Sequence, residues 1–153
     1  MKRFIYSIFA VLALSCTFVA CGDDGDEQIA YSTTAEQATA GTYSGTWTRT
    51  GNDGEVTYSG SVTLAAGAAQ NVSSVTFNCP EANLNATSVA NVWNAGHNFQ
   101  FMNQVASNNP SNGLGAAFAG YISQAGELTT SFTLSQRVGR QNLEFKYVFV
   151  GKK

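Results

Sequence analysis

The sequence predicts an all-β domain, built as an eight-stranded antiparallel meander β-barrel, with a β-sandwich as the alternative. From residue 41 onward, apolar and hydroxyl-bearing side chains alternate along short segments. This two-residue period is typical of strands that bury one face. Turn-forming residues separate the segments, and no long pattern of helical period interrupts them. About eight strands fit this length, and closing them into a barrel removes the bare edges of a sandwich.

The first two strands form the clearest hairpin. Residues 41–50 carry Tyr43 and Trp47 on one face and threonines and serines on the other. Residues 51–54, Gly-Asn-Asp-Gly, supply positive φ angles at little cost, which predicts a tight turn. Residues 56–64 then alternate valine, tyrosine, glycine and leucine with hydroxyl side chains. The hairpin is therefore expected to bury one face and to expose rows of hydroxyls.

Six further strands are expected after this hairpin. In chain order they cover residues 72–79, 84–93, 97–105, 114–122, 128–138 and 143–149. Residues 84–93 also fit a strand with a bulge or a partly helical segment. Pro80, residues 107–113, Gly126 and residues 139–141 provide the breaks between strands. One apolar face of the seventh strand is expected to consist of Leu128, Phe132, Leu134 and Val138.

The N-terminal residues have the pattern of a secretory signal. Lys2 and Arg3 precede an apolar run that ends at Ala20. A positive start, an apolar run and a small residue before the cut are the features of such a signal. The run is also slightly short for a permanent membrane helix. Residues 1–20 are therefore expected to be removed as a signal peptide.

The stretch Phe18-Val19-Ala20-Cys21 resembles the lipobox of bacterial lipoproteins, although leucine is usual where Phe18 stands. The resemblance implies that a diacylglycerol joins the Cys21 sulfur and that Cys21 begins the mature chain. Acyl chains such as palmitate would then hold the protein on a membrane, because each buried methylene contributes about 0.8 kcal/mol. Cys16 is the second candidate, but a cut there leaves the apolar residues 17–20 on the mature chain.

Residues 21–40 are expected to form an acidic, flexible tether. They contain no base and no sustained apolar face. Their acids are Asp23, Asp24, Asp26, Glu27 and Glu36. Acids directly after a lipidated cysteine resemble the export signal of surface lipoproteins in some Gram-negative bacteria. The resemblance implies an outer-membrane lipoprotein that is periplasmic or exposed on the cell surface.

The expected barrel domain, residues 41–153, is close to neutral and has no basic face. Nucleic acid is therefore not an expected partner. Once Cys16 is removed and Cys21 is lipidated, Cys79 has no cysteine to pair with, and a buried, inert thiol is expected. One cysteine and one histidine serve a metal poorly, so neither a metal nor another cofactor is expected.

The residues Gly45-Thr46-Trp47 resemble the Gly-x-Trp signature that opens calycin barrels, the lipocalin group. The last residues, 145–151, are similar to the final strand of calycin-like bacterial lipoproteins of unknown function. The resemblance implies an eight-stranded barrel that is able to bind a ligand. It also implies a cation packed across Trp47, for which Arg137, Arg140 and Lys146 are candidates. Trp47 also fits a plain core aromatic.

No catalytic constellation is apparent, so the protein is not expected to be an enzyme. The chain has no Gly-x-Ser-x-Gly motif, and His97 shares a strand face with phenylalanines. The domain's one aspartate, Asp53, lies in a predicted turn. Paired carboxylates for glycoside hydrolysis would have to come from Asp53, Glu55, Glu81, Glu127 and Glu144. Most of these lie in or beside predicted turns, where solvated charges are expected.

Two functions remain. The first is binding of a small apolar or amphipathic ligand, because an eight-stranded barrel has room inside for side chains or for one small ligand. Its contacts would come from aromatic residues: Trp47, Tyr58, Trp93, Phe99, Phe101 and Tyr121. The alternative is a glycan- or protein-binding surface that uses exposed aromatics, for which Trp93, Tyr58 and Tyr121 are candidates. Inhibitor-type barrels belong to this alternative, since Ser59-Gly60 resembles the Ser-Gly motif of lysozyme inhibitors.

Overall fold

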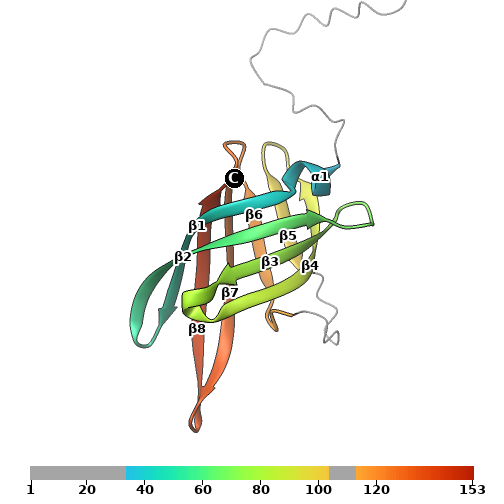
Figure 1. The fold of residues 1–153 in the computed structure, drawn as a ribbon. Coiled ribbons are helices and arrows are strands. Elements are labelled where there is room, and N and C mark those ends of the chain that lie inside the picture. The colour runs from blue at the N-terminus through green and yellow to red at the C-terminus, as the bar shows by residue number, and fades with distance from the viewer. Residues whose placement is uncertain (1–33, 104–112) are drawn as a thin grey trace, which may run out of the picture.

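The protein is an all-β, eight-stranded antiparallel barrel in which each strand pairs with its neighbours in sequence (Figure 1). The computed structural model describes residues 34–103 and 113–153. The strands are β1 (Gly41–Gly51), β2 (Gly54–Ala66), β3 (Val72–Cys79), β4 (Leu84–Asn94), β5 (Phe99–Asn103), β6 (Phe118–Ile122), β7 (Glu127–Val138) and β8 (Gln141–Lys152). The prediction of a meander barrel is confirmed, and the alternative of a sandwich is wrong.

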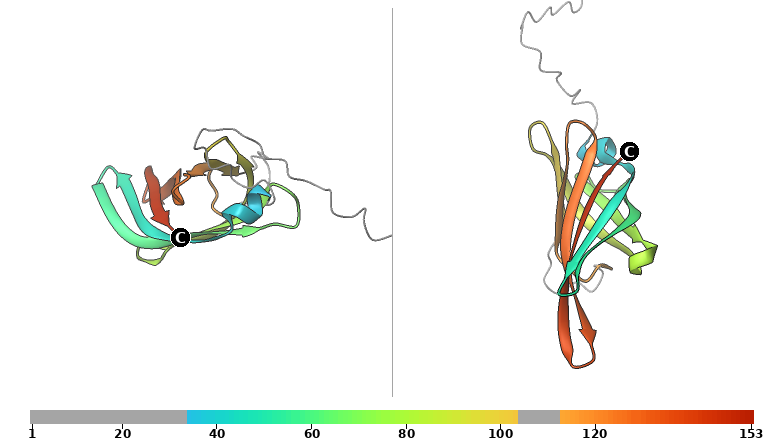
Figure 2. Two further views of the ribbon diagram at one scale, coloured as in Figure 1. Left: turned by 90° about the horizontal axis from the view of Figure 1, so that it is seen from above. Right: turned by 90° about the vertical axis from the view of Figure 1, so that its left-hand side faces the viewer.

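The first and last strands close the barrel. β1 pairs antiparallel with β8 from Ser44 opposite Lys152 to Thr50 opposite Lys146. Because β1 also pairs with β2 along its whole length, neither edge of β1 is bare over this stretch. Figure 2 shows from above how the strands close around the interior.

The middle of the chain differs in detail from the sequence prediction. β4 is a full strand, because it pairs with β3 from Leu84 to Asn91. β5 begins only at Phe99, since residues 95–98 form a turn closed by the Ala95 N–H donating to the Asn98 carbonyl at 2.8 Å. β6 begins at Phe118, where the Asn103 side chain accepts from the Phe118 N–H at 3.2 Å. Residues 104 and 105, at the end of the predicted 97–105 strand, lie outside the described residues.

A short helix, α1 (Ala35–Thr39), lies at one end of the barrel beside the start of β1. It falls within the segment that the sequence assigned to a flexible tether. Ala35 and Thr39 are buried, and the Tyr43 hydroxyl donates to the Thr39 carbonyl at 2.9 Å. The helix is too short to show a helical period in the sequence, and its stability comes from these contacts with the barrel.

Glu36 fastens α1 to the turn between β2 and β3. Its side chain is buried, and Oε2 accepts the Asn71 N–H at 2.8 Å. The neighbouring Thr34 hydroxyl lowers the pKa of Glu36, against desolvation, and backbone N–H groups including that of Asn71 lower it further. The charged carboxylate is therefore the form that the folded protein favours.

Acid should weaken this attachment through Glu36. Because the folded pKa lies below the unfolded value near 4.5, the contribution to stability is present above that value and is lost as pH falls through the folded pKa. Glu36→Gln should therefore flatten the fall in melting temperature between about pH 5 and pH 3. The measurement is thermal unfolding across that range. Glu81→Gln, at an exposed carboxylate, is the control, and identical profiles for wild type and Glu36→Gln would refute the role of Glu36.

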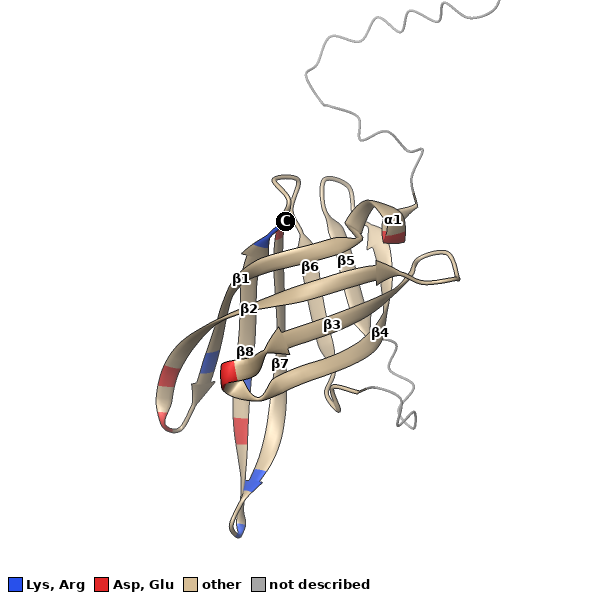
Figure 3. Cartoon of the chain, in the orientation of Figure 1, with Lys and Arg blue, Asp and Glu red and all other residues tan. Residues whose placement is uncertain are grey.

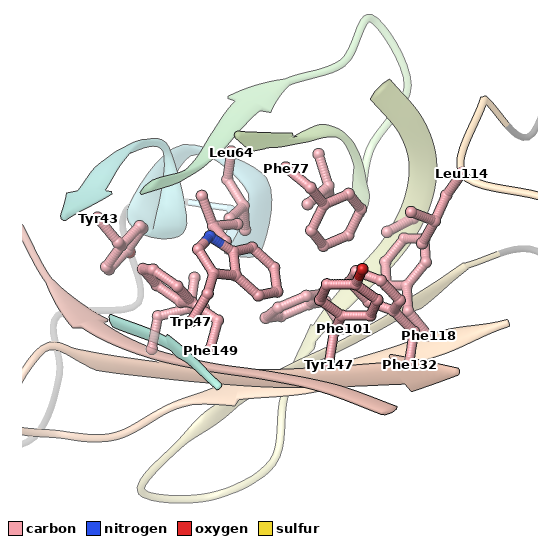
Figure 4. Packing of buried hydrophobic residues seen from close by; sticks show 14 of the residues in the cluster. Tyr43, Trp47, Leu64, Phe77, Phe101, Leu114, Phe118, Phe132, Tyr147 and Phe149 are labelled. Atoms are coloured by element: carbon pink, nitrogen blue, oxygen red, sulfur yellow. The ribbon is translucent and has the colours of Figure 1, made fainter. Parts of the chain in front are cut away.

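Aromatic side chains fill the barrel interior (Figure 4). The Trp47 ring is fully buried, with its centroid 4.9 Å from that of Phe149 and 5.6 Å from that of Phe132. Phe77 continues the cluster through Phe118, at 4.9 Å between centroids. These residues alternate with outward-facing ones along their strands, as the two-residue period predicted.

Gly60 allows the Trp47 ring to lie against β2. A Cβ atom at Gly60 would lie 2.7 Å from Trp47 Cδ1 and 2.4 Å from the Asn78 carbonyl oxygen. The same carbonyl accepts a hydrogen bond from the Trp47 indole Nε1 at 3.2 Å. The absence of a side chain at Gly60 therefore leaves room on β2 for the Trp47 ring and for its hydrogen bond to Asn78 on β3.

Two hairpins, β1–β2 and β7–β8, extend beyond the barrel at the end opposite α1 (Figure 1). β7 pairs with β6 only as far as Phe132, so its last residues have β8 alone as a neighbour. This corrects the expected apolar face of the seventh strand: Leu128 and Phe132 are buried, but Val138 is 55% exposed.

The cation implied by the calycin resemblance is not where the resemblance placed it. Arg137, Arg140 and Lys146 are all exposed. Instead Arg49, on β1, stacks over Phe145 with its guanidinium carbon 4.8 Å from the ring centroid, and it forms an ion pair with Asp53. The extended β7–β8 hairpin carries Arg137 and Arg140 away from the core, and Lys146 lies on the outward-facing side of β8, between the buried Phe145 and Tyr147.

Candidate functional site

A groove lies on the outer surface of the barrel over β4, β5, β6 and β7, with a volume of about 460 Å³. Its position follows from the strand register. Trp93 pairs with Gln100, which pairs with Tyr121, which in turn pairs with Thr129. Paired residues of neighbouring strands point to the same side of a sheet. These four side chains therefore form one row on the outside of the barrel.

The alternation of burial along β5 shows which side is the outside. Phe101 and Asn103 are buried, whereas Gln100 and Met102 are exposed. The side chains of Gln100 and Met102 therefore point outward and line the groove. Phe101 borders the groove from the interior side of the wall.

Small residues on β6 create the hollow. Ala119 faces outward between Met102 on β5 and Ser131 on β7. Its methyl group leaves the centre of that row low, while Tyr121 stands on the next outward position of the same strand. On the inner side, a Cβ at Gly120 would lie 2.3 Å from the Phe101 ring, so the core already occupies the space beneath. The groove has the volume of a small-molecule site, but it is open to solvent, so a ligand bound there would remain partly exposed.

The groove combines aromatic surface with uncharged hydrogen-bonding groups. Tyr121 is 44% exposed and Trp93 is partly buried. The amide side chains are Asn98 and Gln100, and the hydroxyls are Thr129 and Ser131. Each amide offers both donors and acceptors, and each hydroxyl offers both as well. The arrangement can stack a flat apolar face and hydrogen-bond the polar groups around it.

Three of the four strands that line the groove, β4, β5 and β6, carry no charge, and β7 carries Glu127 at its start and Arg137 near its end. β3, β4, β5 and β6 contain no lysine, arginine, aspartate or glutamate. In the described residues the charges lie instead on α1, on the turn after β3, on the two extended hairpins and at the barrel rim (Figure 3). An ionic ligand would therefore find no opposite charge on β3, β4, β5 and β6.

The six aromatic residues named from the sequence separate into two groups. Trp93, Phe101 and Tyr121 border the groove. Trp47 is fully buried in the core, and Tyr58 and Phe99 are partly buried against it. Sequence reasoning missed the polar contributors, Gln100 and Thr129, because only the pairing register places them beside the aromatic residues.

The filled interior counts against a ligand held inside the barrel. Burial raises the pKa of Tyr43 to about 12, and it also raises the pKa of Tyr147, which lies near Arg49 and Tyr58. The Cys79 thiol is fully buried, and burial raises its pKa above the usual value. Its Sγ lies 3.9 Å from the Ser59 carbonyl oxygen, its hydrogen-bond acceptor. Such a thiol is poorly reactive.

The residues considered for catalysis do not come together. His97 is exposed in the turn between β4 and β5. Asp53 is paired with Arg49, and Glu127 lies 3.7 Å from Lys152 at the opposite end of the barrel. Within the described residues, no three histidine, cysteine, aspartate or glutamate side chains are grouped as metal ligands would be.

Comparisons with protein-family models, with curated proteins and with solved structures each gave no match. Among the described residues, no helix has the length and hydropathy needed to span a membrane. The fold thus defines the class: a closed eight-stranded antiparallel β-barrel with an aromatic core. The likeness to calycins remains a resemblance carried by Gly45-Thr46-Trp47.

Proposed function

We propose that the protein is a lipid-anchored, non-enzymatic binding module of a Gram-negative outer membrane, and that it binds glycans through the outer groove. The observation that carries the proposal is the groove itself. It combines the exposed ring of Tyr121 and the partly buried ring of Trp93 with amide and hydroxyl side chains, and three of its four strands, β4, β5 and β6, hold no charge.

Glycans match this surface chemically. A sugar ring has a flat face of C–H groups and a rim of hydroxyls. The flat face suits stacking on Trp93 or Tyr121, whose rings offer large apolar areas at low cost in side-chain entropy. The rim suits Gln100 and Thr129, which both donate and accept hydrogen bonds. A purely apolar ligand would leave these polar groups without partners, which costs free energy.

The other candidate sites fit less well. A small apolar ligand inside the barrel would have to displace the Trp47 cluster, whose members are almost fully buried. A protein partner would also favour the exposed Met102 and Tyr121. However, the groove is concave and rimmed by amides and hydroxyls, which favours a small polyhydroxylated ligand.

The anchoring half of the proposal rests on the residues around Cys21, which lie outside the described residues. A thiol follows a small residue at the end of an apolar run, as lipoprotein processing requires. Acids follow it at once, and the barrel comes later in the chain. A domain tethered in this way would present its groove to glycans in the periplasm or at the cell surface.

Trp93→Ala should reduce glycan affinity by about tenfold or more, because it removes one wall of the groove. Binding is measured on a glycan array and then by calorimetry on the hits. Val89→Ala is the matched control, since Val89 is exposed on the outer face of the same strand but does not line the groove. Unchanged melting temperatures would show that both variants fold. Equal affinities for Trp93→Ala and wild type, or capture of a protein but no glycan, would refute the proposal.

A further inference from the structure

We infer that the ligand of the groove is an uncharged glycan chain of at least three rings that lies across the strands, with Trp93 and Tyr121 on different rings. This inference rests on the proposed function and specifies the ligand of that same site. It follows from the strand register and from the placement of charges.

The register sets the spacing between the two aromatic residues. Trp93 is on β4 and Tyr121 is on β6, and both pair with Gln100 on the intervening β5. Neighbouring strands lie about 4.8 Å apart, so the Trp93 and Tyr121 backbones are separated by roughly 10 Å. One pyranose ring is too narrow to stack on both.

The row of Trp93, Gln100, Tyr121 and Thr129 runs across the strands, so a sugar chain bound along it also runs across the strands. Each step between strands along the row, about 4.8 Å, is comparable to the length of one sugar ring in an extended chain. A ring on Trp93 and the next ring but one on Tyr121 therefore place the middle ring over Gln100. Thr129 continues the row beyond Tyr121 and offers a hydroxyl to the ring that follows.

Next to the row of Trp93, Gln100, Tyr121 and Thr129, on the side of Met102, the surface of β6 and β7 consists of backbone and small side chains. Ala119 forms the low floor, and Ser131 stands next to it on β7. The Thr130 hydroxyl is not available to a ligand, because its side chain is buried and donates to the Ala119 carbonyl at 2.9 Å. The polar contacts of the chain are thus expected from Gln100, Thr129 and Ser131.

The charge distribution selects a neutral chain. A uronic acid or a sulfated sugar placed over β4–β6 would lose part of its hydration with no cation on these strands to compensate for it. The charge on β7 closest in sequence to Thr129 is Glu127, and it is already paired with Lys152 at 3.7 Å. This pair has no net positive charge to attract an acidic sugar.

The test is an array that carries linear gluco-, manno- and galacto-oligosaccharides from single rings to hexasaccharides, beside galacturonic acid oligomers of the same lengths. The purified protein should bind neutral chains, with affinity rising at least about tenfold from disaccharide to tetrasaccharide. The galacturonic acid oligomers should bind at least about tenfold more weakly than neutral chains of equal length.

Variants locate the chain on the protein. Trp93→Ala and Tyr121→Ala should each weaken tetrasaccharide binding about tenfold. A disaccharide is too short to reach both rings, so it should lose affinity in only one of these variants, and Val89→Ala should behave as wild type. Equal affinities for disaccharide and tetrasaccharide, no effect of Tyr121→Ala, or stronger binding of the acidic oligomers would overturn this inference alone. The absence of any glycan binding would refute the proposed function and this inference together.

Discussion

Trp47→Ala is expected to leave the barrel largely unfolded or close to unfolding at physiological temperature. The indole is fully buried and contacts the rings of Phe77, Phe132 and Phe149. Truncation of a buried tryptophan costs about 3–5 kcal/mol, because neighbouring side chains collapse only partly into the cavity. The Asn78 carbonyl also loses its donor, which adds about 1–3 kcal/mol. The sum is comparable to the whole stability of a typical domain, about 5–15 kcal/mol.

The measurement is the free energy of unfolding from urea titration. Trp47→Phe keeps a large ring but removes the indole N–H, so it should lose about 1–3 kcal/mol and separate packing from hydrogen bonding. Val150→Ala, at an exposed position on β8, should stay within about 0.5 kcal/mol of wild type. If Trp47→Ala lowered the free energy of unfolding by less than about 1 kcal/mol, Trp47 would not be the centre of the core.

Much of the barrel could be predicted because the signals for its strands and turns lie within short segments of the sequence. The alternation of Tyr43 and Trp47 with hydroxyl residues, and the Gly-Asn-Asp-Gly turn after them, determine a hairpin without reference to the rest of the chain. The register bears this out, with Gly51 opposite Gly54 and Trp47 opposite Tyr58. Residues 84–93 were ambiguous because mixed small and polar residues carry little period, and pairing with β3 decides the outcome.

The groove was harder to predict because its parts meet only through pairing. Alternation shows which residues of one strand share a face, but it does not show which face of the next strand matches it. The sequence alone therefore groups Phe101 with Trp93, although their side chains lie on opposite sides of the barrel wall. Gln100 and Thr129 carry no distinguishing signal of their own, and they enter the site only because they stand in register with Tyr121.

The segment before the barrel shows a similar limit. Composition correctly marks residues 21–40 as acidic, but it does not show that Glu36 contacts a turn far along the chain. The partner of Glu36 is the Asn71 N–H, in a turn where Asn71 has a φ of 60°. A backbone group exposed by a left-handed residue leaves no trace in a pattern of side chains.

Cys21→Ser is expected to abolish lipidation completely. The lipid attaches through a thiol, and a serine hydroxyl does not replace it, so the protein should stay uncut or appear as a soluble periplasmic form. Cys21 lies outside the described residues, and in the sequence it precedes the first strand of the barrel by 20 residues. The variant should therefore unfold at the same temperature as wild type once both are solubilised.

The experiment is metabolic labelling with a fatty-acid probe, followed by membrane fractionation. Cys16→Ser is the matched control: it makes the same chemical change within the expected signal peptide and should leave label and membrane association intact. Retention of label in Cys21→Ser with loss in Cys16→Ser would move the cut upstream and place residues 17–20 on the mature chain. Absence of label from the wild type would remove the anchor from the proposed function. The proposal that the groove binds glycans would remain to be tested, because the residues that line the groove lie on β4–β7 and in the turn between β4 and β5, and their assignment as a binding site does not involve the lipid.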